Sequence, residues 1–250
     1  MRTIFFDGRY VNVNPQIVEA FTPGVFKVKG VFETMLGVDG VVMDCALHIR
    51  RLKEGLSILG INPPTINPSV LKQVLNCNQL ATARVRVMVW EAPAGQAVKQ
   101  THLMMVALPY KAAAKKSFRV CLLRTKRAAN DALANVKSLD YELFAQAYAK
   151  AQESGFDEAL LLNSSGHIFE ASRANIFWIK DKILYTPPLS SGCLNGITRQ
   201  QVIKQAKSLK TTVHEVDLTP AILKKSDAAF LTNSLIGIKP VDVTSISNIT

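Results

Sequence analysis

One stretch of the chain, residues 157–201, constrains the fold more than any other because short apolar runs alternate in it with turn signals. The runs and turns follow in this order: apolar 160–162, Ser-Gly at 165–166, apolar 168–179, Asp-Lys at 181–182 and apolar 183–185. Short apolar runs bounded by turn residues are typical of strands, so the stretch predicts a strand meander. One acid, Glu170, lies inside the meander, and Gly196, Ile197 and Thr198 open a predicted helix at its end. An acid among strands and a helix start can hold two ends of one ligand.

The formal net charge of +11 raises the question of nucleic-acid binding, because a basic protein attracts phosphates. The lysines and arginines, however, form short pairs spread along the chain, at 50–51, 115–116, 126–127 and 224–225. Dispersed charges of this kind are typical of a solvated surface. The sequence therefore predicts no nucleic-acid partner.

The cysteines and histidines argue against a metal centre. The four cysteines contain no C-x-x-C pair, and the four histidines are scattered. Zinc sites need regular spacings of these residues, so we expect reduced thiols and no metal. The N-terminus lacks the pattern of a signal peptide, and no apolar run approaches the roughly 20 residues of a membrane helix. We expect a soluble, cytoplasmic protein with no membrane partner.

The first part of the chain has the pattern of an α+β domain. Its predicted elements are a hairpin at 3–13, an irregular segment at 14–29, a hairpin at 31–44, a helix from 45 to Gly60, a helix at 68–79 and strands at 81–92 and 101–110. Both hairpins turn at Asp-Gly, which suits a tight primed turn. We therefore predict an N-terminal α+β domain at 1–110 and a connector at 111–117.

A second domain is predicted at 118–250. Its elements are a strand at 118–124, a helix at 138–152, the meander, a helix at 199–209 and a strand at 227–233. Strands that alternate with helices in this way predict an α/β domain.

Two residues of this second domain are candidates for chemistry. Lys137 lies between Val136 and Leu139. A lysine in an apolar pocket becomes a nucleophilic amine that can form a Schiff base, although an ordinary structural lysine is the alternative. Glu170 lies where strand alternation predicts partial burial, and a buried carboxylate needs a partner. A protonated ring nitrogen of a ligand would serve, and so would an arginine such as Arg173.

Two further features suit a phosphate. Thr198 and Gln201 match a capping box, with Thr198 as the N-cap, and Gly196 allows a close approach of the backbone. The N–H groups of a helix start attract phosphate, but a plain capped helix is the alternative. Arg51, on the predicted helix with His48 on a similar face, could clamp a phosphate bidentately or be a solvated charge. An amine, an acid, an arginine and a helix start are together the parts that bind pyridoxal phosphate.

Six segments resemble the class IV aminotransferase family, the fold type IV pyridoxal-phosphate enzymes. They are GVFETM (30–35), ALHIRRL (46–52), VKSLDY (136–141), GFDEALLLNSSGHIFEASRANIFWIKDKILYTPPL (155–189), NGITRQQVI (195–203) and LTNSLIGIKPV (231–241). They have the family's order and spacing over nearly the whole chain. The resemblance implies a two-domain α+β fold like that of D-amino acid aminotransferase, with a C-terminal domain that carries the Schiff-base lysine. It also implies pyridoxal 5'-phosphate between the domains and a homodimer.

The resemblance implies a role for each matching residue. Lys137 matches the Schiff-base lysine, which also moves the proton at Cα, and Glu170 matches the acid that keeps the pyridine nitrogen protonated. Arg51 matches the phosphate-binding arginine. The other matches are Ile197 and Thr198 in the phosphate cradle, Asn233 and Ser234 in a second phosphate and substrate loop, and Tyr141 near the cofactor.

The reaction follows from weaker similarities. The segments KSLDY (137–141) and TNSL (232–235) are similar to those of aminodeoxychorismate lyases. D-amino acid aminotransferases have R-x-H after the strand that ends here at Trp90, where this chain has EAPAG (91–95). We therefore expect a lyase of folate biosynthesis that converts 4-amino-4-deoxychorismate, a small-molecule amine, to 4-aminobenzoate and pyruvate. The alternative is a branched-chain or D-amino acid aminotransferase that uses 2-oxoglutarate.

Two departures from the family leave a third function open. Val28 and Lys29 precede Gly30 where many members have Gly-Asp-Gly, and the chain stops soon after 239–241, where relatives often continue through another helix. A cofactor-binding protein with weak or no catalysis is therefore the third hypothesis.

Overall fold

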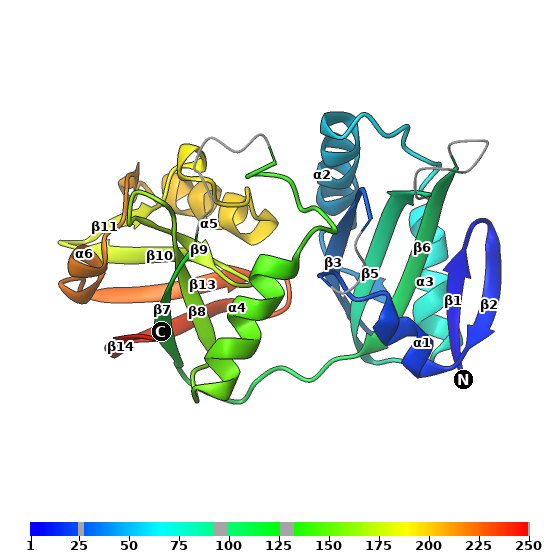
Figure 1. Ribbon diagram of the computed structural model, residues 1–250, viewed down its shortest axis with the longest axis horizontal. Helices are drawn as coiled ribbons and strands as arrows, with labels where there is room; N and C mark the ends of the chain where they lie inside the picture. The colour runs from blue at the N-terminus through cyan, green and yellow to red at the C-terminus, as the bar shows by residue number, and fades with distance from the viewer. Residues whose placement is uncertain (25–27, 93–99, 126–132, 250) are drawn as a thin grey trace. The chain divides into compact units, whose positions relative to one another are not determined.

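The computed structural model describes residues 1–24, 28–92, 100–125 and 133–249, and its chain forms two compact units (Figure 1). The first unit comprises Met1–Ala112 and Val136–Glu142, and the second comprises Ala113–Asn135 and Leu143–Thr250. Part of the EAPAG segment and the basic pair at 126–127 lie outside the described residues.

The first unit contains an antiparallel six-stranded sheet with the order β2-β1-β6-β5-β3-β4. Its strands are β1 (Arg2–Phe6), β2 (Arg9–Val13), β3 (Gly30–Val38), β4 (Val41–Val42), β5 (Thr82–Glu91) and β6 (Thr101–Pro109). Both predicted hairpins are confirmed. Asp7 and Gly8 have φ values of 43° and 90°, as a type I′ turn requires, and Asp39 and Gly40 turn in the same way.

Three helices accompany this sheet: α1 (Pro15–Ala20), α2 (Cys45–Ile58) and α3 (Pro68–Cys77). Helix α2 packs on β3, and α3 packs on β6 and β1. Helix α1 lies in the segment predicted to be irregular. Two local features start this helix. The Asn14 side chain accepts a hydrogen bond from the Gln16 amide, and Pro15 occupies the first helical turn.

The strand β5 separates two environments. Val85, Val87 and Val89 are fully buried on one face, and the intervening positions Arg84 and Arg86 point to the other face. That second face also carries a core of large side chains, namely Ile4, Phe32, Met88, Trp90, Met104, Val106 and Leu139. Two arginines therefore lie beside an apolar cluster in the first unit.

The segment Val136–Glu142 joins the first unit, although the sequence placed Lys137 in the C-terminal domain. The Phe32 amide donates to the Lys137 carbonyl at 3.0 Å, and the Leu139 amide donates to the Gly30 carbonyl at 2.9 Å. These bonds hold the segment extended along β3. Helix α4 (Glu142–Glu153) consequently begins at 142 and not at the predicted 138.

The close approach of this segment requires a glycine at position 30. A Cβ atom there would lie 2.7 Å from Trp90 Cβ and 2.8 Å from Leu139 Cδ1, which real contacts do not allow. Gly30 therefore sets how near the backbone around Lys137 comes to the sheet.

The second unit contains an eight-stranded mixed sheet with the order β12-β11-β10-β13-β14-β7-β8-β9. Its strands are β7 (Phe118–Arg124), β8 (Glu158–Leu162), β9 (Ile168–Ala171), β10 (Asn175–Lys180), β11 (Ile183–Thr186), β12 (Val213–Glu215), β13 (Ala228–Asn233) and β14 (Gly237–Asn248). The pairs β7–β8, β7–β14 and β11–β12 are parallel, and the others are antiparallel.

The predicted continuous meander is wrong. The apolar run 168–179 forms two strands, β9 and β10, because the Ala171 amide donates to the Ala174 carbonyl at 2.7 Å and closes a tight turn. The hairpins β8–β9 and β10–β11 exist, but β13, β14 and β7 lie between them in the sheet order. Periodicity identified the strands and could not show which strands are inserted between them.

The remaining helices of this unit are α5 (Ile197–Ser208) and α6 (Pro220–Lys224), with a 3₁₀ turn at Leu189–Ser191. Its core contains Val120, Leu160, Ile168, Ile176, Leu218, Leu223 and Leu231. Within the described ranges, no helix combines the length and apolar character needed to span a membrane. In the same ranges, no three His, Cys, Asp or Glu side chains gather as metal ligands.

Candidate functional site

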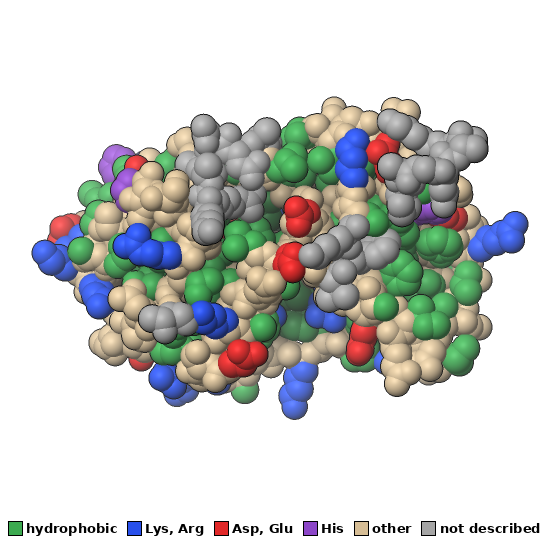
Figure 2. Space-filling view, viewed as in Figure 1, with side chains coloured by type: hydrophobic (Ala, Val, Ile, Leu, Met, Phe, Trp, Pro, Cys, Tyr) green, Lys and Arg blue, Asp and Glu red, His purple; other side chains and the backbone are tan. Residues whose placement is uncertain are grey.

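The eight predicted site residues fall in both units. The first unit contains Arg51, Lys137 and Tyr141, and the second contains Glu170, Ile197, Thr198, Asn233 and Ser234. Among the described residues on the face drawn in Figure 2, lysine and arginine side chains stand as separate groups and form no continuous band.

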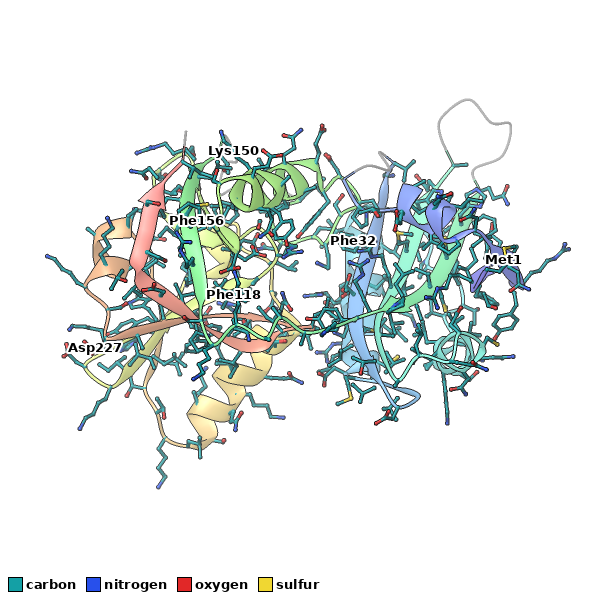
Figure 3. All side chains as sticks on the ribbon, turned by 90° about the horizontal axis from the view of Figure 1, so that it is seen from below. Met1, Phe32, Phe118, Lys150, Phe156 and Asp227 are labelled. Atoms are coloured by element: carbon teal, nitrogen blue, oxygen red, sulfur yellow. The ribbon has the colours of Figure 1, made fainter. Side chains whose placement is uncertain are left out.

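The Lys137 amine lies among aromatic rings of the first unit. Its Nζ is 4.4 Å from the centroid of the Phe32 ring and 5.4 Å from that of Tyr141. The two rings meet edge to face at 5.2 Å. Phe32, labelled in Figure 3, projects from β3, the strand that also fixes the Lys137 backbone. A positioned lysine beside a tyrosine is therefore a feature of this unit.

Two arginines lie on the same face of the sheet as Phe32. The guanidinium carbon of Arg86 is 5.9 Å from the Phe32 ring centroid. Burial and the nearby charge of Arg84 lower the pKa of Arg86 to about 10, and Tyr141 opposes this change. Among the described residues, the buried Nε of Arg86 has no hydrogen-bond partner. Clustered, partly desolvated cations of this kind suit an anionic ligand.

These arginines were not predicted to be functional. The segment RVRVM was interpreted only as the alternation of a strand, and no role was given to its arginines. The missed signal was the apolar character of their neighbours on the same face, since Met88 and Trp90 follow at the same period of two.

Arg51 is held by a buried acid. Its Nε donates to Glu33 Oε1 at 2.7 Å, and its Nη2 donates to Glu33 Oε2 at 2.6 Å. His48 Nδ1 lies 2.7 Å from the same Oε2. The Arg51 side chain is only 12% exposed, so the interpretation as a solvated charge is wrong.

Glu33 is charged despite its burial. Burial alone would raise its pKa, but the ion pair with Arg51 and the hydrogen bonds from His48 and Arg51 lower the pKa to about 2. No role was predicted for Glu33, although an acid in an otherwise apolar strand segment, GVFETM, signals a paired carboxylate.

Glu170 lies on β9 and is 5% exposed. Its Oε2 accepts a hydrogen bond from the Leu194 amide at 3.1 Å. Arg173, the alternative partner, donates from Nε to Glu158 at 2.9 Å. Burial and the charge of Glu170 raise the pKa of the Cys193 thiol to about 12, so this thiol is protonated at neutral pH.

Helix α5 begins beside this acid. Its N-cap is Gly196, and no side chain caps it. The predicted capping box is therefore wrong: Thr198 lies within the first turn, because the helix starts at Ile197. The Gln200 amide donates the first intrahelical hydrogen bond, to the Gly196 carbonyl. The amides of Ile197 and Thr198 therefore lie before the first hydrogen bond of the helix.

The turn before α5 is fixed by Asn175 of β10. A Cβ atom at position 196 would collide with Asn175 Oδ1, so only glycine fits. Asn175 Nδ2 and the Gly196 amide both donate to the Leu194 carbonyl, at 2.7 and 2.9 Å. Leu194 thus connects the Glu170 carboxylate, through its amide, with the start of α5, through its carbonyl.

Asn233 uses its side chain within the protein. Its Nδ2 donates to the Arg173 carbonyl at 2.9 Å, and its Oδ1 accepts from the Leu235 and Ile236 amides at 2.8 and 2.9 Å. These bonds shape the turn that begins with Ser234. Asn233 therefore sets the conformation in which Ser234 is presented.

A comparison with known families decides the identity of the fold. The profile of the family described as Amino-transferase class IV matches residues 30–243. The chain belongs to the class IV aminotransferases. The resemblance found in the sequence is confirmed, and so is the predicted α+β fold of this family.

Related class IV proteins carry two kinds of name. A Methanocaldococcus jannaschii protein provisionally named a branched-chain-amino-acid aminotransferase is 32% identical over 95% of this chain and 86% of its own length. The aminodeoxychorismate lyase of Bacillus subtilis is 30% identical over 95% of this chain and 85% of its own.

Solved structures of this class divide in the same way. The branched-chain aminotransferase from Thermoproteus uzoniensis with norvaline has a TM-score of 0.84, with 25% identity, over 96% of this chain and 86% of that one. A Legionella pneumophila protein provisionally named a 4-amino-4-deoxychorismate lyase has a TM-score of 0.80, with 30% identity, over 88% and 83%. Class IV enzymes use pyridoxal 5'-phosphate, so the predicted cofactor and enzyme class are confirmed.

The described residues fit this cofactor. Glu170 is a buried, rigid acid of the kind that a protonated ring nitrogen needs. The glycine-lined start of α5 leaves amides before the helix ladder, as a phosphate needs. Lys137 supplies a positioned amine, and Arg51 a positioned guanidinium.

Proposed function

We propose that this class IV enzyme is a lyase that converts 4-amino-4-deoxychorismate to 4-aminobenzoate and pyruvate. The observation that carries the proposal is the pair Arg84 and Arg86 on the face of the sheet that also bears Phe32, above which Lys137 lies. The substrate has two carboxylates, and half-buried guanidinium groups such as these bind carboxylates with charge-assisted hydrogen bonds. The lyase name of the Bacillus subtilis relative supports the same reaction.

In this proposal each predicted site residue has a role toward the cofactor. Arg51, Ile197 and Thr198 bind its phosphate, and Glu170 keeps its ring nitrogen protonated. Asn233 shapes the loop in which Ser234 contacts the phosphate and substrate, and Tyr141 lies near the cofactor. When bound, pyridoxal phosphate withdraws electrons from the carbon that carries the substrate amine.

Lys137 moves the proton in this reaction. Its amine takes the proton from the carbon that bears the substrate nitrogen. The C–O bond at the adjacent carbon then breaks, the oxygen keeps the bonding electrons, and the ring becomes aromatic. The released enolate of pyruvate takes up one proton at its methylene carbon to become pyruvate. Phe32 and Tyr141 restrict the amine to one region, as a positioned base requires.

An amino-acid aminotransferase with 2-oxoglutarate is the second candidate, because the Methanocaldococcus and Thermoproteus relatives carry that name. A product assay separates the two. The lyase releases pyruvate and 4-aminobenzoate in equal amounts from aminodeoxychorismate without a keto acid. Turnover only with a pair of amino acid and keto acid would overturn the lyase. Absence of both activities in a protein that binds the cofactor would leave the third hypothesis, a cofactor-binding protein.

The role of the two arginines has its own test. Arg86→Leu should raise KM for aminodeoxychorismate by about a hundredfold, the loss expected for a charge-assisted hydrogen bond. Arg9→Gln, at an exposed position of β2, is the control and should change KM less than about twofold. An unchanged KM in Arg86→Leu would contradict recognition of the substrate by this face.

We also propose a cytoplasmic homodimer that acts in folate biosynthesis. The relatives support it only through their class. Light scattering on the purified protein should give twice the mass of the chain, and a monomeric mass would contradict the dimer.

A further inference from the structure

Glu33 holds the side chain of Arg51 in one conformation. Arginine has a long side chain with many rotamers, and holding it in one of them costs conformational entropy. Here the Nε and Nη2 edge of Arg51 is bound by both oxygens of one carboxylate, at 2.7 and 2.6 Å. A two-point contact of this kind fixes the plane of the guanidinium group as well as its position.

The carboxylate is itself fixed from two sides. Glu33 lies in β3, where it pairs with Val87 of β5, and its side chain is only 1% exposed. His48 contacts the same Oε2 at 2.7 Å. His48 and Arg51 are three residues apart on α2, so one face of the helix presents both side chains to the strand.

The direction of the guanidinium follows from its shape. Because the group is planar, binding of its Nε and Nη2 edge by Glu33 turns the Nη1 side away from that carboxylate. The Arg51 side chain is largely buried, and 12% of it remains accessible.

We propose that Glu33, braced by His48, is a positioning residue that orients Arg51 toward the phosphate group of the cofactor. The proposal rests on the proposed role of Arg51 in phosphate binding. Glu33 does not touch the phosphate, and it acts only by restricting Arg51 to the orientation that binds. Its loss should therefore weaken the part of cofactor affinity that depends on the phosphate, and no other part.

Two ligands separate these parts of the affinity. Pyridoxal 5'-phosphate and pyridoxal differ only in the phosphate, and both react with a lysine amine. The dissociation constant of each is measured by titration of the apoprotein and of its variants, with the visible absorbance of the bound ligand as the signal. The dissociation constant of pyridoxal divided by that of pyridoxal phosphate reports the phosphate contribution independently of catalysis. A variant that loses this contribution lowers the ratio.

The isosteric variant Glu33→Gln should weaken binding of pyridoxal phosphate about tenfold or more, as the loss of one supporting hydrogen-bonded group typically does. Binding of pyridoxal should change less than about twofold. His48→Gln, which keeps the Glu33–Arg51 ion pair, should give a smaller loss of the same kind and serves if Glu33→Gln does not fold. Arg50→Gln, an exposed arginine of the same helix, is the matched control and should leave the ratio unchanged.

Arg51→Gln distinguishes the two ways of failure. If Arg51→Gln lowers the ratio and both Glu33→Gln and His48→Gln leave it unchanged, the positioning role is wrong and the phosphate role of Arg51 stands. If Arg51→Gln also leaves the ratio unchanged, the assignment of Arg51 to the phosphate is wrong, and the positioning role fails with it. A loss of equal size for both ligands would make Glu33 a structural residue only.

Discussion

Each unit buries a glutamate beside an arginine, and the pKa values of the two glutamates shift in opposite directions. In the first unit, Glu33 is 1% exposed and Arg51 12% exposed, and two hydrogen bonds join them. In the second, Glu158 is 3% exposed, but Arg173 is 44% exposed and donates from Nε to one carboxylate oxygen. The pKa of Glu33 falls to about 2, whereas burial raises the pKa of Glu158 above its ordinary value.

The comparison shows that the partners of these two buried acids decide the direction in which each pKa moves. Burial favours the neutral form of both carboxylates. Glu33 overcomes it with the two Arg51 bonds and the contact with His48. Glu158 has Arg173 and the Ser172 hydroxyl, and these only offset part of the cost. A charged, rigid acid is suited to hold an arginine for a ligand.

The largest effect should come from removing the two acids. Glu33→Ala should destabilise the protein by about 3–5 kcal/mol, because Arg51 and His48 lose their buried partner. Glu158→Ala should cost only about 1–2 kcal/mol, because Arg173 can turn to solvent and stays over the Tyr148 ring. Urea unfolding measures both changes. Equal losses of unfolding free energy would contradict the difference between the two ion pairs.

The pH dependence should differ in sign between the pairs. The pKa of Glu33 is lower in the folded state, so its contribution is present above about pH 4.5 and is lost as the pH falls toward about 2. This contribution is about 3 kcal/mol. The pKa of Glu158 is raised, so its contribution is present below about pH 4.5 and is lost as the pH rises through the folded value.

Unfolding free energies of Glu33→Gln and Glu158→Gln, measured between pH 3 and pH 7, separate these contributions. Relative to the unsubstituted protein, Glu33→Gln should lose the most stability at pH 7, and Glu158→Gln should lose the least there. The same pH trend in both variants would contradict the opposite pKa shifts of the two acids.

The smallest change in stability is expected for an exposed ion pair, which differs from both buried pairs. Arg50 and Glu54 lie 3.8 Å apart with 63% of each side chain exposed. Arg50→Gln should change the unfolding free energy by less than about 0.5 kcal/mol, because solvent screens such a pair. A loss near that of Glu33→Ala would show that exposure does not distinguish the two arginines of α2.

Local features of the fold were predictable from the sequence, and long-range ones were not. The Asp-Gly turns at 7–8 and 39–40 act over two residues, so both hairpins were recovered. The grouping of Lys137 with β3 depends on bonds to Gly30 and Phe32, more than a hundred positions earlier, which no local pattern contains. The split of the run 168–179 has a different cause: it depends on a local turn between Ala171 and Ala174, which apolar periodicity did not distinguish from a continuous strand.

In the candidate site, too, local features were predictable and long-range contacts were not. Glu170 and the start of α5 were predictable because each stands out within its own segment. The pairing of Arg51 with Glu33 needs the contact of a helix with a strand, so Arg51 alone suggested a solvated charge. The Thr198 capping box matched a motif in sequence, but Asn175 and Gly196 fix the turn before the helix and move its start.

The central claim is that Lys137 is the lysine that binds pyridoxal phosphate, and peptide mapping after borohydride reduction tests it most directly. Reduction should abolish the visible absorbance of the yellow protein and leave one pyridoxyl group on the peptide that contains Lys137. The Lys137→Ala variant should show neither the absorbance nor the label. A label on another lysine, or a colourless protein that takes up no added cofactor, would contradict the assignment.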